Sequence, residues 1–195
     1  MNRRMKLFSA AAVLLAWSGV ASAHVGHEDA TFGNGLAHPF GGLDHLLAMV
    51  AVGLLGAKCG LRWRYLLPVS FVAGLGLGGL LGAFHVGLPA VELSISLSVL
   101  LFGGLLAAST RVSPWVLAGI VLVAGIPHGH AHLTEAGAGS VVGYGVGMVL
   151  GSALLHAGGL LLGLAIGQAK VLRDRWQWVA GPAIACAGLF LAVTL

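Results

Sequence analysis

Histidines are the residues of this chain whose type and spacing could do chemistry. Nine of the 195 residues are His, against only six Asp and Glu together. Imidazoles with few carboxylates and almost no thiolate suit borderline divalent metals such as nickel, cobalt, zinc or copper, whereas harder cations such as magnesium prefer oxygen ligands. The candidate metal ligands beside or within apolar runs are His38, Asp44, His45, His128, His130, His132, Glu135 and His156.

Spacing sharpens this prediction at the later group. His128 and His132 are four residues apart and therefore share one face of a helix, as in other two-histidine metal sites. His130 points elsewhere if the segment stays helical. Pro127 and Gly129 could unwind the helix locally and turn all three imidazoles inward. The intervening Glu of an HExxH site is missing, which argues against a metalloprotease.

The earlier group needs a bend. His38 and His45 are seven residues apart, about 10 Å along an ideal helix, and could not hold one ion if the segment were straight. Pro39 and Gly42 lie between them and favour a break in the helix. Asp44 could bind metal itself or orient an imidazole as a carboxylate partner.

Other polar residues have two interpretations each. His156 falls inside an apolar run, where it could serve a metal path or be a buried His bonded to a neighbouring helix. Glu135 could instead be a solvated loop residue. The remaining candidates, for metal capture at an outer mouth, are His24, His27, His85 and Glu92. A solvated tail explains the first two equally well, and a simple interfacial position explains His85.

Composition identifies the solvent that surrounds these residues. The chain is 58% hydrophobic and 8% charged, whereas soluble domains carry roughly 25% charged residues. So few charges exclude a water-soluble fold and predict a membrane protein in a lipid bilayer. The net charge of +4 does not indicate nucleic-acid binding, because the basic residues are few and scattered.

The N-terminus predicts export. Residues 1–23 have a basic start, a short apolar run and a small-residue ending at Ala21-Ser22-Ala23, the pattern of a cleavable signal peptide. An uncleaved additional helix is the alternative. Cleavage leaves residues 24–195 as one transmembrane domain whose N-terminus lies outside the inner membrane.

Six later segments are apolar enough to cross a bilayer, so we predict an all-α membrane protein: a multi-pass six-helix bundle. Their ranges are 36–57, 65–84, 91–109, 114–132, 141–168 and 176–194. All later Lys and Arg residues fall in the first, third and fifth connections: Lys58, Arg62, Arg64, Arg111, Lys170, Arg173 and Arg175. The positive-inside rule makes that side cytoplasmic, with both mature ends outside.

Two motifs resemble the HupE/UreJ family. The stretch from His38 to Gly53, HPFGGLDHLLAMVAVG, resembles the family's HPxxGxDHLLAMvavG motif. The stretch ending at Glu135, PHGHAHLTE, is similar to its FHGxAxGxE pattern, with Pro127 for the usual Phe and Leu133 for the usual Gly. The resemblance covers essentially the whole chain. It implies that the metal path is lined by His38, Asp44, His45, His128, His130 and Glu135.

That family consists of small membrane proteins associated with nickel hydrogenases and ureases and regarded as secondary nickel, sometimes cobalt, permeases. The resemblance therefore implies inner-membrane uptake of Ni²⁺ or Co²⁺ as transported substrate, with no prosthetic group, no enzyme activity and a functional link to hydrogenase or urease maturation proteins. Three alternatives remain open at this point. The first is a metal-binding accessory or sensor protein that does not translocate, and the second is an intramembrane metalloenzyme. The third is an exporter, which would more naturally place its capture ligands on the cytoplasmic side, where the predicted loops contain no His and only Asp174 as an acidic residue.

Overall fold

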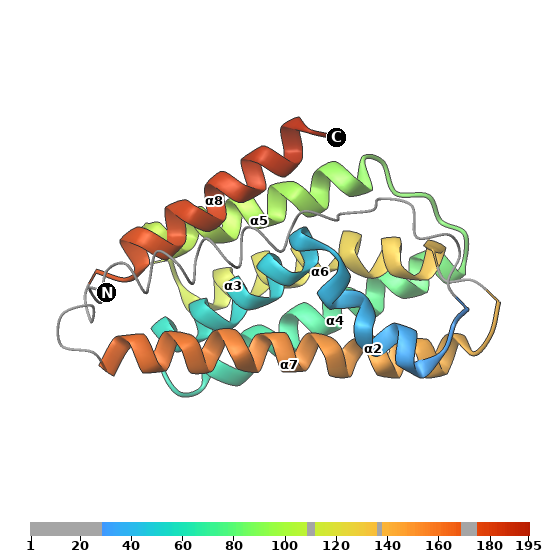
Figure 1. Cartoon of the computed structure of the whole chain (residues 1–195), viewed down its shortest axis with the longest axis horizontal. Helices are drawn as coiled ribbons and strands as arrows, with labels where there is room; N and C mark the ends of the chain where they lie inside the picture. Colours follow the sequence, from blue (N-terminus) through green and yellow to red (C-terminus); the bar gives the residue numbers. More distant parts are fainter. Residues whose placement is uncertain (1–28, 109–111, 136–137, 169–174) are drawn as a thin grey trace, which may run out of the picture.

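The computed structural model describes residues 29–108, 112–135, 138–168 and 175–195, and these ranges are helical apart from their connections (Figure 1). The predicted signal peptide, residues 1–23, and two predicted capture residues, His24 and His27, lie outside the described residues. The helices are α2 (Phe32–Gly41), α3 (Leu43–Cys59), α4 (Trp63–Ala83), α5 (Val91–Ala107), α6 (Pro114–Glu135), α7 (Val141–Gln168) and α8 (Gln177–Val193).

Three of these helices, α4, α6 and α7, are long and apolar enough to cross a membrane, and α2 with α3 makes a fourth span if the bent pair is counted as one. The predicted spans 91–109 and 176–194 appear as the 17-residue helices α5 and α8. Helices of that length rise about 26 Å, a little less than the roughly 30 Å of bilayer hydrocarbon. The predicted multi-pass, all-helical class is therefore seen, with two short helices.

The predicted first span is broken where the sequence indicates a break. Helices α2 and α3 meet at an angle of 84°. The joint is Gly42, whose backbone is extended (φ −101°, ψ 128°), and α2 ends within three residues of Pro39. The break places the first turn of α3 inside the molecule, with α2 beyond it.

From α3 onward the helices alternate in direction (Figure 1). The C-terminal end of α3 meets that of α5, where Lys58 donates hydrogen bonds of 3.1 Å to the carbonyls of Leu106 and Ala108. The same end of the molecule holds the N-terminal ends of α4 and α6, where the rings of Trp63 and Trp115 lie 4.9 Å apart. This end also holds Arg62, Arg64 and Arg175, which the sequence predicts to lie in cytoplasmic loops. We call it the basic end.

Glycines set the closest helix contacts. A Cβ on Gly78 of α4 would overlap the carbonyl oxygen of Ile126 in α6, and one on Gly53 of α3 would overlap that of His156 in α7. On α5, a Cβ at Gly103 would overlap the backbone of α8 at Ala185. Three tightly packed pairs result, α4 with α6, α3 with α7, and α5 with α8, as expected where backbones pack through small residues.

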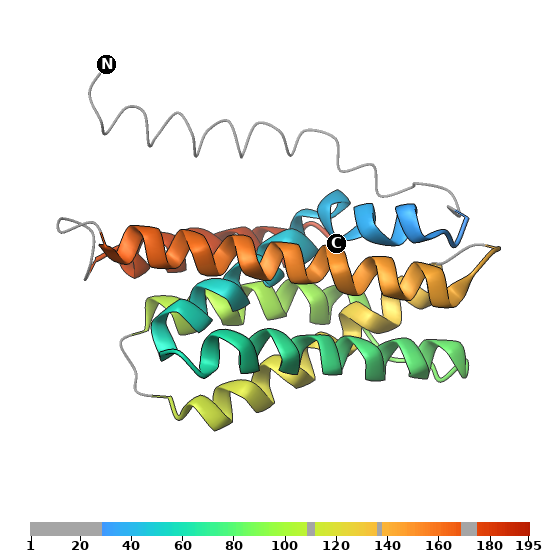
Figure 2. The same cartoon turned by 90° about the horizontal axis from the view of Figure 1, so that it is seen from below.

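Helix α7 is the longest element, and α2 and α3 lie along it one after the other (Figure 2). Gly147 of α7 meets the backbone of Phe32 in α2, and farther along Gly159 meets that of Val50 in α3. Both halves of the broken segment therefore run in the same direction as α7. A re-entrant loop would return toward its starting side, whereas these two halves continue across the molecule.

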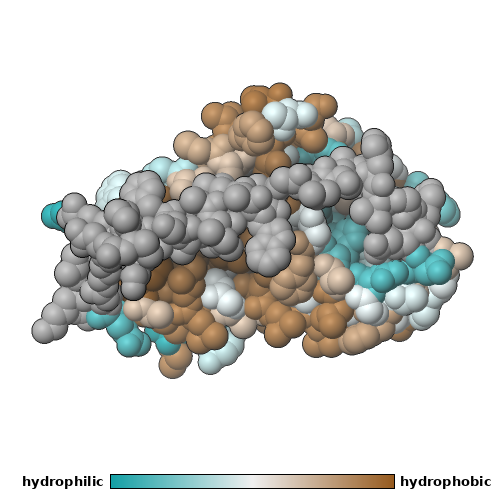
Figure 3. Space-filling model, in the orientation of Figure 1, coloured by the Kyte–Doolittle hydropathy of each residue, from teal (hydrophilic) through white to brown (hydrophobic). Residues whose placement is uncertain are grey.

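The outer surface is apolar. Large side chains such as Val142, Val179 and Leu161 are 78%, 72% and 65% exposed. Figure 3 shows hydrophobic residues over much of the visible middle of the molecule and hydrophilic residues toward its two ends. Such a distribution suits a protein surrounded by lipid rather than water.

Candidate metal path

Four imidazoles from three helices meet beside the break between α2 and α3. His38 comes from α2, His45 from α3, and His128 and His132 from α6. The ring of His132 lies 4.5 Å from that of His38 and 4.5 Å from that of His45, and the ring of His128 lies 4.7 Å from that of His45. We call these four residues the imidazole cluster. The break makes it possible, because it lets α2 bring His38 back toward His45, with ring centroids 6.2 Å apart.

Asp44 fixes the orientation of His45. Its Oδ1 accepts hydrogen bonds of 2.7 Å from both the backbone N–H and the ring Nδ1 of His45. Since a carboxylate accepts, the ring proton resides on Nδ1 and the lone pair on Nε2. Gly42 makes room for this arrangement, because a Cβ there would lie 2.6 Å from the same Oδ1. A carboxylate behind an imidazole is the usual support of a metal-binding histidine.

A hydroxyl fixes His128 in the same way. The Ser98 Oγ donates to the carbonyl of Ile95 at 2.7 Å and lies 2.9 Å from Nε2 of His128. Its only hydrogen is used on Ile95, so Nε2 of His128 donates and Nδ1 carries the lone pair. His130 follows the same rule, since its Nε2 lies 2.9 Å from the carbonyl oxygen of Val86 and must donate to it.

The nitrogens left over have no partner. Seven buried ring nitrogens on five histidines lack a hydrogen bond within the described residues: Nε2 of His45, Nδ1 of His128 and His130, and both nitrogens of His132 and His156. His128 and His132 are completely buried, and His156 is 2% exposed. A buried polar atom without a partner costs about 1–3 kcal/mol. Because a neutral imidazole carries one lone pair and one N–H, these five rings leave one buried lone pair each without a partner.

His156 lies apart from the imidazole cluster, on α7. Its ring centroid is 5.3 Å from that of Phe71, and the ring of Phe71 is 5.2 Å from that of His128. The neighbouring-helix hydrogen bond considered for His156 is not seen, because both ring nitrogens lack a partner within the described residues. His156 therefore adds one unpaired lone pair and one unpaired N–H, both buried, and its ring shares Phe71 as a neighbour with His128.

The other predicted residues are placed elsewhere. Helix α6 runs without interruption through Pro127, so the expected unwinding does not occur and His130 points away from the imidazole cluster toward the α4–α5 connection. His85 and Glu92 are exposed near the end opposite the basic end. Glu135 is the last residue of α6, and its side chain is outside the described part of the structure.

Sequence reasoning missed three supporting residues. Ser98 could have been found, because Ser94, Ser96 and Ser98 are the polar residues that follow Glu92 in an otherwise apolar α5. Gly42 was considered only as a break, not as the residue that admits the carboxylate of Asp44. Phe71 gave no signal, since a phenylalanine within an apolar span is ordinary.

The rings pack edge to face in this conformation. Interplanar angles are 84° for His38 with His132 and 82° for His45 with His128. Within the described residues, no three His, Cys, Asp or Glu side chains are placed to hold one ion together. The described structure thus brings buried imidazoles close together without directing three of them at one point.

Comparisons with known proteins agree with the motifs. The family described as HupE / UreJ protein matches residues 12–191. Protein HupE of Rhizobium leguminosarum bv. viciae is 40% identical over 182 residues, which cover 92% of this chain and 93% of that protein. No solved structure gives a significant match.

Proposed function

The chain belongs to the HupE/UreJ family, and on that premise we propose that it is a permease that takes up Ni²⁺, or Co²⁺, across the inner membrane. The ion is transported substrate and not a resident cofactor. Its destination would be nickel enzymes such as hydrogenase or urease, through their maturation proteins. We propose that the chain is not an enzyme. In this proposal residues 1–23 form its signal peptide and residues 24–195 form its transport domain.

We further propose six crossings with both mature ends outside. The alternating helix directions support this, because α3, α5 and α7 all end at the basic end, where α4, α6 and α8 begin. The positive-inside rule makes the basic end cytoplasmic. Helices α2 and α3 count as one broken span because both follow α7 in the same direction. Discontinuous spans that line a central site are common in secondary transporters.

The seven buried nitrogens without partners are the observation that carries the proposal. When a hydrogen bond holds the N–H of one ring nitrogen, the other nitrogen presents its lone pair. Such a nitrogen is a suitable ligand for a borderline divalent ion. His45, His128 and His130 each show this arrangement, with a carboxylate, a hydroxyl and a backbone carbonyl as the fixing group. Nickel rather than zinc or copper follows from the family premise, not from the donor set.

The proposed path begins at the outer end. His24, His27, His85 and Glu92 would raise the local ion concentration there, with Glu135 and His130 nearer the site. The imidazole cluster and Asp44 would replace the water around the ion, and His156 would receive it on the way to the cytoplasm. No GxxxxGK[ST] motif for ATP occurs in the sequence. A divalent ion moving inward gains about 4.6 kcal/mol per ~100 mV of membrane potential.

Radioactive nickel uptake in cells without their own nickel transporters tests this proposal. Wild type would be compared with His45→Ala, His132→Ala and Ser70→Ala at matched membrane abundance. Ser70 is the control because its hydroxyl bonds only the Leu66 carbonyl of its own helix among the partners seen. We expect uptake by wild type and Ser70→Ala and none by the two histidine variants. Cobalt and zinc competition would rank the metals.

A second candidate, a membrane accessory protein that binds metal without translocating it, is favoured by one observation. Completely buried apolar side chains separate the imidazole cluster from the basic end, among them Val52, Leu67 and Phe102. A well-inserted wild type that binds nickel but takes none up would establish this candidate and refute the permease. Turnover of a substrate by the metal-loaded protein would instead support the intramembrane metalloenzyme.

A further inference from the structure

Phe71 is an aromatic side chain that contacts both the imidazole cluster and His156. Its ring centroid lies 5.2 Å from that of His128, with an interplanar angle of 61°, and 5.3 Å from that of His156, with an angle of 72°. The side chain is completely buried. Phe71 is therefore a direct neighbour of a histidine of the imidazole cluster on α6 and of His156 on α7.

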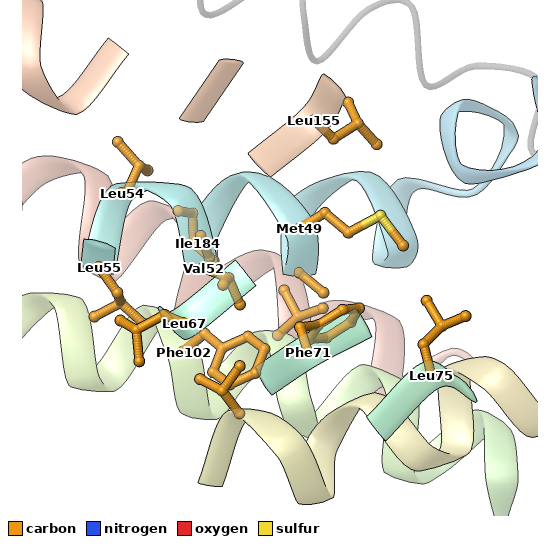
Figure 4. Packing of buried hydrophobic residues seen from close by; sticks show 14 of the residues in the cluster. Met49, Val52, Leu54, Leu55, Leu67, Phe71, Leu75, Phe102, Leu155 and Ile184 are labelled. Atoms are coloured by element: carbon orange, nitrogen blue, oxygen red, sulfur yellow. The ribbon is translucent and has the colours of Figure 1, made fainter. Parts of the chain in front are cut away.

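Buried apolar side chains form a layer that continues from Phe71 toward the basic end (Figure 4). The ring of Phe102 lies 6.4 Å from that of Phe71, and both are completely buried together with Val52 and Leu67. Each of these residues lies between the site and the basic end along its own helix. These four side chains carry no polar atom that could replace the water around a metal ion.

The backbone of Phe71 is fixed to the helix that carries two of the imidazoles. A Cβ on Gly125 of α6 would lie 2.5 Å from the carbonyl oxygen of Phe71, and one on Gly129 would overlap that of Leu75. Helices α4 and α6 are therefore in close backbone contact at the level of Phe71. The Phe71 backbone is held against the helix that carries His128 and His132, whereas His156 belongs to α7.

We propose that Phe71 is the selectivity gate of the path: its ring separates the imidazole cluster from His156 and excludes ions that keep their hydration shell. The inference rests on the proposed permease function. A hydrophobic constriction stops hydrated ions because it gives them nothing in exchange for water. An ion already held by imidazoles has exchanged its water before it reaches the ring. Nickel can do this, whereas magnesium, which favours oxygen ligands and dehydrates reluctantly, cannot.

Reconstituted full-length protein tests the gate. Liposomes would contain indicators for Ni²⁺ and for Mg²⁺, and would carry wild type, Phe71→Ala, Phe71→Leu or Phe102→Ala. Phe102 is the matched control because it is equally buried and adjacent to Phe71 but belongs to the layer below the site. Equilibrium nickel binding would be measured on the same preparations. Phe71→Leu keeps most of the apolar volume, so it carries the test if the alanine variant fails to insert.

We expect wild type and Phe102→Ala to carry nickel and exclude magnesium. Phe71→Ala should admit magnesium at roughly tenfold the wild-type background, with Phe71→Leu between them and nickel affinity unchanged in both. Magnesium exclusion by both Phe71 variants, or an equal leak through Phe102→Ala, would overturn the gate while leaving the permease standing. Wild type that carries no nickel would overturn the permease and, with it, the gate.

Discussion

Replacement of Asp44 by Asn isolates the role of the carboxylate behind His45. Asparagine has nearly the same shape as aspartate but carries no charge. Its amide oxygen can still accept the two 2.7 Å hydrogen bonds that Oδ1 now accepts from the backbone N–H and ring Nδ1 of His45. The substitution therefore removes the charge and leaves the local geometry in place.

The expected magnitude follows from the hydrogen bond to the ring. A bond to a charged acceptor contributes about 1.5–3 kcal/mol and a neutral one about 0.5–1.5 kcal/mol. The difference, about 1–1.5 kcal/mol, is the support that the His45 ring loses as a metal ligand, and it corresponds to roughly a tenfold rise in the nickel Kd. Loss of comparable supporting groups at metal sites costs about 10–100-fold in affinity.

Calorimetric titration of the purified protein with Ni²⁺ would measure this change. Asp29→Asn is the matched control, since Asp29 is an exposed carboxylate just before α2 and removal of its charge leaves the imidazole cluster intact. The unfolding temperature of Asp44→Asn should fall by only about 2–6 °C, because the metal-free protein loses the same hydrogen-bond strength. Wild-type nickel affinity in Asp44→Asn, alongside lost binding in His45→Ala, would refute the carboxylate's role.

Two further predictions concern the groups that hold the imidazoles in place. Ser98→Ala removes the hydroxyl that accepts from Nε2 of His128. The loss of about 1 kcal/mol should weaken nickel binding roughly fivefold in the same calorimetric titration. An equally large loss of nickel affinity in Ser70→Ala would argue against a specific effect. Gly159→Ala would force a Cβ against the backbone of α3, while a Cβ at the adjacent Gly158 meets only open space. Thermal unfolding in detergent should show that Gly159→Ala is destabilised by about 1–3 kcal/mol. Gly158→Ala should be unchanged or slightly more stable. Similar unfolding temperatures for the two variants would contradict the close α3–α7 contact.

Local features of the site could be predicted from the sequence because they depend on one helix at a time. The i, i+4 spacing of His128 and His132 places both in the imidazole cluster, and the Pro and Gly residues before Asp44 do break the helix. The alternative for His130 that assumed a continuous helix was the correct one, since α6 tolerates Pro127 without unwinding.

Contacts between helices could not be predicted in this way. The meeting of His38 with His132, and of Phe71 with both His128 and His156, depends on how glycine-rich faces pack α2, α4, α6 and α7 together. Periodicity shows which residues share a face but not which other helix that face contacts. The lengths of α5 and α8 were likewise overestimated by about two residues each, because apolar composition continues past the point where the helix ends.

X-ray absorption spectroscopy of the nickel-loaded protein tests the central claim most directly, because it reports the atoms bound to the ion. Wild type should show several imidazole nitrogens around nickel, and His132→Ala should show fewer, while His85→Ala, which removes an exposed imidazole outside the cluster, should match wild type. A nickel ion surrounded only by oxygen, or a spectrum unchanged in His132→Ala, would contradict the claim that the buried imidazole cluster binds the transported ion.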